Sequence, residues 1–81
     1  DTFRGLPLAY EAMTKGGNMP TVFNAANEAA VALFLQKKIS YLQITQIIEE
    51  CMNYSTFVAA PNVEQILETE AQVRESIESR W

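Results

Sequence analysis

The sequence has 81 residues, 48% of them hydrophobic, and a formal net charge of −4 from six basic and ten acidic residues. This length suits one small domain, and its few basic residues do not form the Lys and Arg cluster that a nucleic-acid surface requires, so no nucleic-acid partner is expected. The chain has no histidine and one cysteine, Cys51, so it lacks the usual zinc ligands and cannot form an internal disulfide.

The first residue and the lengths of the apolar runs indicate where the protein is located. The chain begins with Asp1 rather than Met and shows no export signal, so we expect a piece of a longer protein. No apolar run reaches the ~20 residues that a membrane span needs. We therefore expect a soluble chain with no membrane partner.

The first segment is predicted to be a helix that starts close to Pro7, with Thr2 as its candidate cap. Gly16 and Gly17 should end it, because glycine tolerates the left-handed conformation that closes a helix, and Lys15 lies beside the negative end of the helix dipole. One face at helical spacing carries Leu6, Ala9, Tyr10 and Met13.

The stretch from Pro20 to Leu35 is predicted to be a helix that is apolar on nearly every side. From Val22 to Leu35, 11 of 14 residues are apolar. The three exceptions fall at i, i+3 and i+4 and form one narrow polar stripe: Asn24, Asn27 and Glu28. A helix of this kind is normally surrounded by other elements, so we expect it to be the central helix of the fold.

Both ends of this central helix carry suitable residues. Asn18 can cap it, and Pro20 suits the first turn, where its missing N–H is not needed. Lys37 and Lys38 suit the last turn, beside the free carbonyl groups.

A third helix is predicted after Ser40, because Ser40 and Gln43 match a capping box. Its apolar positions follow i, i+3, i+4, i+7 and i+8 and indicate one buried face: Ile44, Ile47, Ile48, Cys51 and Met52. Residues 54–61 should form a loop whose apolar Phe57 and Val58 tuck under the helices.

A fourth helix is predicted from Asn62 to the end of the sequence, with Gln65 at the reciprocal capping-box position. Glu70 interrupts its apolar side and is expected to pair with Arg74. That apolar side consists of Val63, Ile66, Leu67, Val73, Ile77 and Trp81. Four helices with short connections predict an all-α fold, a small antiparallel four-helix bundle that forms a single domain over residues 1–81.

The polar stripe of Asn24, Asn27 and Glu28 is the strongest candidate for specific chemistry, because polar groups on a buried helix need hydrogen-bond partners. We expect the two amides to hold loop or neighbouring-helix backbone and Glu28 to reach solvent or a partner; contact with a missing neighbouring domain fits equally well. Both are favoured over catalysis or metal binding. In the first case, Asn27→Leu should change stability by more than about 1 kcal/mol, and a negligible change would place the stripe on an interdomain surface.

The remaining candidates are interpreted as structural. Glu49 and Glu50 point about 100° apart on a helix and make poor co-ligands for a metal, so they indicate a solvated face. Cys51 lies on an apolar stripe and is interpreted as a small core residue rather than a nucleophile. We therefore expect no catalytic, cofactor-binding or metal-binding residue.

Several short motifs along the chain form a recognisable set. The most specific is the ungapped segment FNAANE at residues 23–28. It is accompanied by LAYEA at 8–12, GG at 16–17, proline at 20, AV at 30–31, FL at 34–35, and Ile39, Tyr41, Ile44, Ala71 and Arg74. Together these motifs resemble a known family, the C-terminal domain of 1-deoxy-D-xylulose-5-phosphate reductoisomerase. The resemblance covers essentially all 81 residues.

The resemblance implies a parent enzyme with an N-terminal NADPH-binding domain, a central catalytic domain with Mg or Mn, and this helical domain at its C-terminus. Such an oxidoreductase converts 1-deoxy-D-xylulose 5-phosphate to 2-C-methyl-D-erythritol 4-phosphate in the non-mevalonate route to isoprenoids. It implies a homodimer in the bacterial cytoplasm, or in a plastid-type organelle in a eukaryote.

Within that enzyme, the family's metal-binding, phosphate-binding and histidine residues belong to the central domain. The resemblance therefore implies that this fragment is inactive alone, holds no cofactor and packs against the catalytic domain of the same chain. Asn24, Asn27 and Glu28 are the residues expected to fix that packing.

Two other functions were weighed. One is a free-standing helical module that binds a partner helix through an exposed apolar patch. The other is a small metal-dependent hydrolase built on a carboxylate bundle, which would need Glu-x-x-His pairs that a sequence without histidine lacks.

Overall fold

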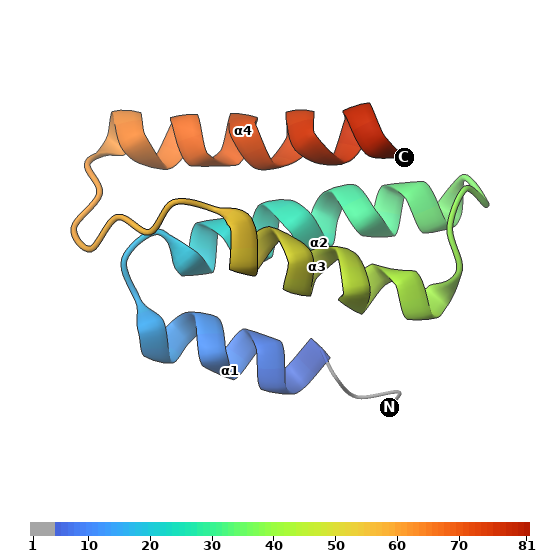
Figure 1. Ribbon diagram of the computed structural model, residues 1–81, viewed down its shortest axis with the longest axis horizontal. Helices are drawn as coiled ribbons and strands as arrows, with labels where there is room; N and C mark the ends of the chain where they lie inside the picture. The colour runs from blue at the N-terminus through green and yellow to red at the C-terminus, as the bar shows by residue number, and fades with distance from the viewer. Residues whose placement is uncertain (1–4) are drawn as a thin grey trace.

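The computed structural model describes residues 5–81, which form four helices and contain no strand. These are α1 (Gly5–Lys15), α2 (Met19–Leu35), α3 (Tyr41–Tyr54) and α4 (Val63–Arg80). Consecutive helices run in opposite directions, and α1 and α4 lie on opposite sides of the α2–α3 pair (Figure 1). The all-α, four-helix prediction is confirmed, whereas Thr2, the candidate first cap, lies outside the described residues.

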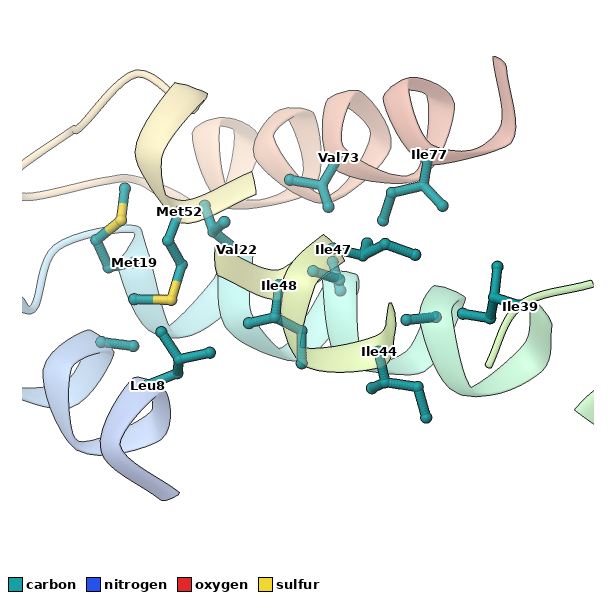
Figure 2. Close-up of a cluster of buried hydrophobic side chains, with 14 residues drawn as sticks. Leu8, Met19, Val22, Ile39, Ile44, Ile47, Ile48, Met52, Val73 and Ile77 are labelled. Atoms are coloured by element: carbon teal, nitrogen blue, oxygen red, sulfur yellow. The ribbon is translucent and has the colours of Figure 1, made fainter. Parts of the chain in front are cut away.

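Helix α2 is the central helix, as predicted, because it packs against each of the other three. Its contact positions are mostly small, and Ala25, Ala26 and Ala30 are buried. Figure 2 shows the core that results, with Leu8 entering from α1 on one side and Val73 and Ile77 from α4 on the other. Small side chains on α2 let its neighbours approach closely, so the core is built around this helix.

Helices α3 and α4 begin where their capping boxes predict. Gln43 Oε1 accepts a hydrogen bond from the Ser40 N–H at 2.7 Å. Before α4, Asn62 Oδ1 accepts from the Gln65 N–H at 2.7 Å, and Gln65 Oε1 accepts from the Asn62 N–H at 3.0 Å. The predicted face of α3 is also confirmed, with Ile44, Ile47, Ile48 and Met52 buried and Cys51 half-buried.

The apolar faces of the two outer helices differ from the sequence expectation. Helix α1 buries Leu8 and Ala12, and the stripe of Leu6, Tyr10 and Met13 is exposed. The reason is that α1 has apolar residues on two sides, and the side with smaller residues fits against α2 and α3.

On α4 the buried positions are Thr69, Val73 and Ile77, while Val63 and Leu67 are exposed. The predicted pair of Glu70 with Arg74 is wrong, because Arg74 reaches across to α2 instead.

The end of α2 also differs from expectation. Lys37 and Lys38 lie beyond the last turn, and their backbone closes the helix: the Lys37 N–H donates to Phe34 O and the Lys38 N–H donates to Leu33 O, both at 2.9 Å. Lys37 has a φ of 63°, in the left-handed region that usually requires glycine at this position. This tight closure turns the chain into α3.

Asn18 precedes α2 as predicted, but its side chain makes no capping hydrogen bond. It is only 1% exposed and reaches other parts of the chain. Its Nδ2 donates to Thr56 O at 2.8 Å and to Thr69 Oγ1 at 3.2 Å, and its Oδ1 accepts from the Val58 N–H at 2.9 Å. The Asn18 N–H also donates to Val58 O at 3.0 Å. One residue therefore joins the α1–α2 turn to the loop after α3 and to α4.

Gly17 brings that turn against the same loop. Its φ is 58°, and a Cβ at this position would collide with Val58 O and the Phe57 ring. Lys15 Nζ lies 5.6 Å from the centre of that ring, a cation–π contact. The Phe57 side chain remains partly exposed. The loop therefore packs against the helices more through its backbone, at Val58, than through the Phe57 ring.

Asn18→Ala is expected to lower the free energy of unfolding by about 2–3 kcal/mol, because it removes the hydrogen bonds of the buried Thr69 hydroxyl and of the part-buried loop backbone at Thr56 and Val58. The measurement is urea unfolding followed by circular dichroism. Asn27→Ala on α2 is the control and should change stability by less than about 0.5 kcal/mol, since Asn27 is exposed. Equal effects of the two substitutions would contradict the role of Asn18.

Gly17→Ala is expected to destabilise the domain by about 1–3 kcal/mol more than Gly16→Ala, because overpacking is added to the cost of a left-handed backbone. Gly16 has a similar φ of 70°, but a Cβ there meets nothing within 4 Å. Thermal unfolding of the two variants isolates the steric part. If both melt at the same temperature, the close approach of Gly17 to the loop is unimportant.

Candidate functional site

The polar stripe of α2 lies on the surface. Asn24, Asn27 and Glu28 are all exposed, and within residues 5–81 neither asparagine side chain has a hydrogen-bond partner. The expectation that this stripe is buried and satisfied inside the bundle is wrong, because the other three helices do not close around α2. The large cost expected for Asn27→Leu therefore no longer follows, since no buried partner would be left unpaired.

Among residues 5–81, Glu28 is the one member of the stripe that makes a polar contact with another helix. Its Oε1 lies 3.5 Å from Arg74 Nη2 of α4, and both side chains are substantially exposed. An exposed pair at this distance adds at most about 1 kcal/mol to stability. Glu28 thus reaches both solvent and a partner, as expected from the sequence.

Two neighbouring hollows lie where α1 meets α2 and α3. The larger has a volume of about 380 Å³, and its walls include Leu6, Ala9, Phe23, Asn27, Val31 and Tyr41. The smaller, of about 160 Å³, shares Ala9 and Phe23 and adds Met13 and Asn24. We name the two together the α1 groove.

The α1 groove is mainly apolar. Among residues 5–81, no Asp, Glu, Lys or Arg lines either hollow, and the polar side chains include the amides of Asn24 and Asn27. Tyr41 stands at its edge and packs edge-to-face on Phe34, with ring centres 5.8 Å apart. Such a lining suits contact with another apolar surface.

Cys51 lies in a different hollow, between α3 and α4, of about 180 Å³. Burial raises the pKa of the Cys51 thiol, the neighbouring Glu50 raises it further, and Arg80 opposes both. Arg80 Nη2 is itself paired with Glu50 Oε1 at 2.9 Å. A thiol with a raised pKa stays protonated at neutral pH and is a poor nucleophile, which favours the structural interpretation of Cys51.

The described part of the chain also bears on metal binding and on membrane crossing. Among residues 5–81, no three His, Cys, Asp or Glu side chains lie close enough to hold a metal ion. Within the same residues, no helix has the length and apolar character to cross a membrane.

Sequence reasoning missed two features that matter for this site. Asn18 was assigned only a local capping role, and nothing local distinguishes that role from a buried tertiary one. The apolar stripe of α1 was recognised, but the spacing of Leu6, Tyr10 and Met13 does not say whether it faces the core or the surface.

Comparison with known proteins identifies the family. Residues 1–76 match the family described as DXP reductoisomerase C-terminal domain. The chain is 57% identical over all 81 residues to 1-deoxy-D-xylulose 5-phosphate reductoisomerase of Agathobacter rectalis, 58% to that of Lachnospira eligens and 52% to that of Clostridium novyi.

In each case the match covers 100% of this chain and 21% of the relative, so the chain spans about a fifth of the length of these curated relatives. No solved structure matches the chain significantly. The alignments with these relatives cover all 81 residues, and the family match covers residues 1–76, so the two comparisons agree. This chain belongs to the family of DXP reductoisomerase C-terminal domains.

Proposed function

We propose that this chain is the non-catalytic C-terminal domain of a 1-deoxy-D-xylulose 5-phosphate reductoisomerase. The observation that carries the proposal is that the whole chain is 57% identical to a segment of an enzyme of that name, and that this segment makes up 21% of the enzyme. The parent enzyme would convert 1-deoxy-D-xylulose 5-phosphate to 2-C-methyl-D-erythritol 4-phosphate, with NADPH as reductant and Mg or Mn as metal. The NADPH and metal sites would lie in the other four fifths.

The chemistry of the described residues supports a structural role. Within residues 5–81, no Asp, Glu, Lys or Arg lines the α1 groove, and the thiol of Cys51 has a raised pKa. The mainly apolar lining of the groove suits contact with another part of the protein. The domain would act by packing beside the catalytic domain and holding the architecture around that site.

We also propose that the parent enzyme is a homodimer in the bacterial cytoplasm, with the catalytic domain of the same chain as the direct partner of this one. The bacterial source of the relatives supports the bacterial setting. The exposed apolar stripe of α1 would also suit a free-standing module that binds a partner helix. Full-length identity to a segment of a larger enzyme favours the domain over the module.

A domain exchange tests this proposal. The matching segment of the Agathobacter rectalis relative is replaced by this chain, and NADPH oxidation by 1-deoxy-D-xylulose 5-phosphate is measured. The chimera is expected to keep its rate within about tenfold of the unaltered relative. Exchanging a structural domain should raise the activation free energy only through imperfect packing, by at most about 1.4 kcal/mol.

Two controls accompany the exchange: the relative with this segment deleted, and the relative with an unrelated helical bundle of equal length in its place. Both should lose nearly all activity. Full activity after deletion would show that the enzyme does not depend on this domain, and loss of activity in a folded chimera would contradict the assignment.

A further inference from the structure

We infer that the α1 groove, together with the exposed stripe of Leu6, Tyr10 and Met13, is the surface on which the catalytic part of the same parent chain docks. The inference rests on the proposed function and adds to it the face of the domain that makes the contact. Its occupant is an apolar segment of the polypeptide that precedes this domain in the enzyme.

The first support is the exposure of large apolar side chains on α1. Leu6, Tyr10 and Met13 are 72%, 75% and 70% exposed and follow i, i+4 and i+7 on one side of the helix. An apolar stripe that has no covering element in a domain marks a contact surface. The α1 groove runs beside this stripe and shares Leu6 and Met13 with it.

The second support is the distribution of charge. Among residues 5–81 the groove has no charged lining residue, whereas α4, on the other side of the α2–α3 pair, exposes Glu64, Glu68, Glu75 and Glu78. Covering the α4 side would remove these carboxylates from water, at a cost that an apolar segment could not offset. Covering the α1 side desolvates few charges, so an apolar partner is favoured there.

The third support is the path of the chain. The family match assigns this chain to a C-terminal domain, and its relatives are about five times longer, so most of the parent polypeptide precedes α1. Gly5 and Leu6, at the start of α1, are themselves in the groove wall. The preceding segment therefore reaches the groove at a high effective concentration, which favours its docking over that of a separate partner.

The amides of Asn24 and Asn27 give this contact its specificity. Both are exposed on the groove wall and have no partner within residues 5–81. In a covered groove each amide must find a donor and an acceptor, and the backbone of the docked segment supplies them. The polar stripe of α2 would thus fix the position of a mainly apolar contact.

The test is hydroxyl-radical footprinting of the active chimera described above, with each side chain's oxidation rate normalised to its rate in the urea-unfolded protein. Tyr10 and Tyr54 form a matched pair, because they are 75% and 83% exposed within the domain and Tyr54 lies towards α4. Docking on the α1 groove predicts that Tyr10 and Met13 oxidise at least about threefold more slowly than expected from the exposure of each side chain in the domain alone. Tyr54 should oxidise at the rate expected from its exposure.

A pair of substitutions in the chimera tests the same surface independently. Leu6→Glu places a charge in the groove, and Leu67→Glu places one at an exposed leucine of α4. Because both sites are exposed in the domain, neither variant should unfold it. Leu6→Glu is expected to restore the oxidation of Tyr10 and to reduce activity at least about tenfold, the effect of about 1.4 kcal/mol, and Leu67→Glu to change neither.

The outcomes separate this inference from the proposed function. An active chimera in which Tyr10 is as reactive as Tyr54, or in which Tyr54 alone is protected, overturns the docking surface and leaves the proposed function standing. A folded but inactive chimera with Tyr10 and Met13 protected supports the docking surface and counts against the proposed function.

Discussion

The buried amide of Asn18 is the interaction on which the arrangement of the four helices depends. Apolar contacts alone would not fix the position of α4 along the α2–α3 pair, because the contacts that bury Val73 and Ile77 are not directional. The Asn18 side chain removes that freedom, since it must bond Thr56, Val58 and Thr69 together to avoid an unsatisfied polar group in the core. The bond to Thr69 fixes the position of α4, and the bonds to Thr56 and Val58 fix the loop after α3.

The small residues of α2 explain why the surface is so uneven. Ala25, Ala26 and Ala30 let α3 and α4 pack closely against α2, and the core is filled without Leu6, Tyr10 and Met13 of α1. Helix α1 then needs only Leu8 and Ala12 for its contact, and its larger stripe is left outside. Close packing at the centre thus determines which apolar residues remain available for another domain.

The sequence predicted the features that depend on neighbouring residues. The starts of α3 and α4 follow from capping boxes four residues long, and the buried side of α3 follows from its single apolar stripe. Features that depend on distant residues were missed. Whether α1 turns Leu8 or Leu6 inward is decided by α2 and α3, and the exposure of Asn24 and Asn27 by how far the other helices close around α2. Lys37 was assigned to the last turn because a cation suits the free carbonyl groups there, and nothing in the sequence indicated the left-handed backbone that ends the helix before it.

The two sides of the domain therefore carry different physical chemistry, and this difference links packing to function. The α4 side has exposed carboxylates and the exposed Glu28–Arg74 and Glu50–Arg80 pairs, which water and salt can solvate at little cost. The α1 side has an apolar groove with two amides that have no partner within residues 5–81. Because the described core leaves Leu6, Tyr10 and Met13 exposed, these side chains are available for the interdomain contact that we propose.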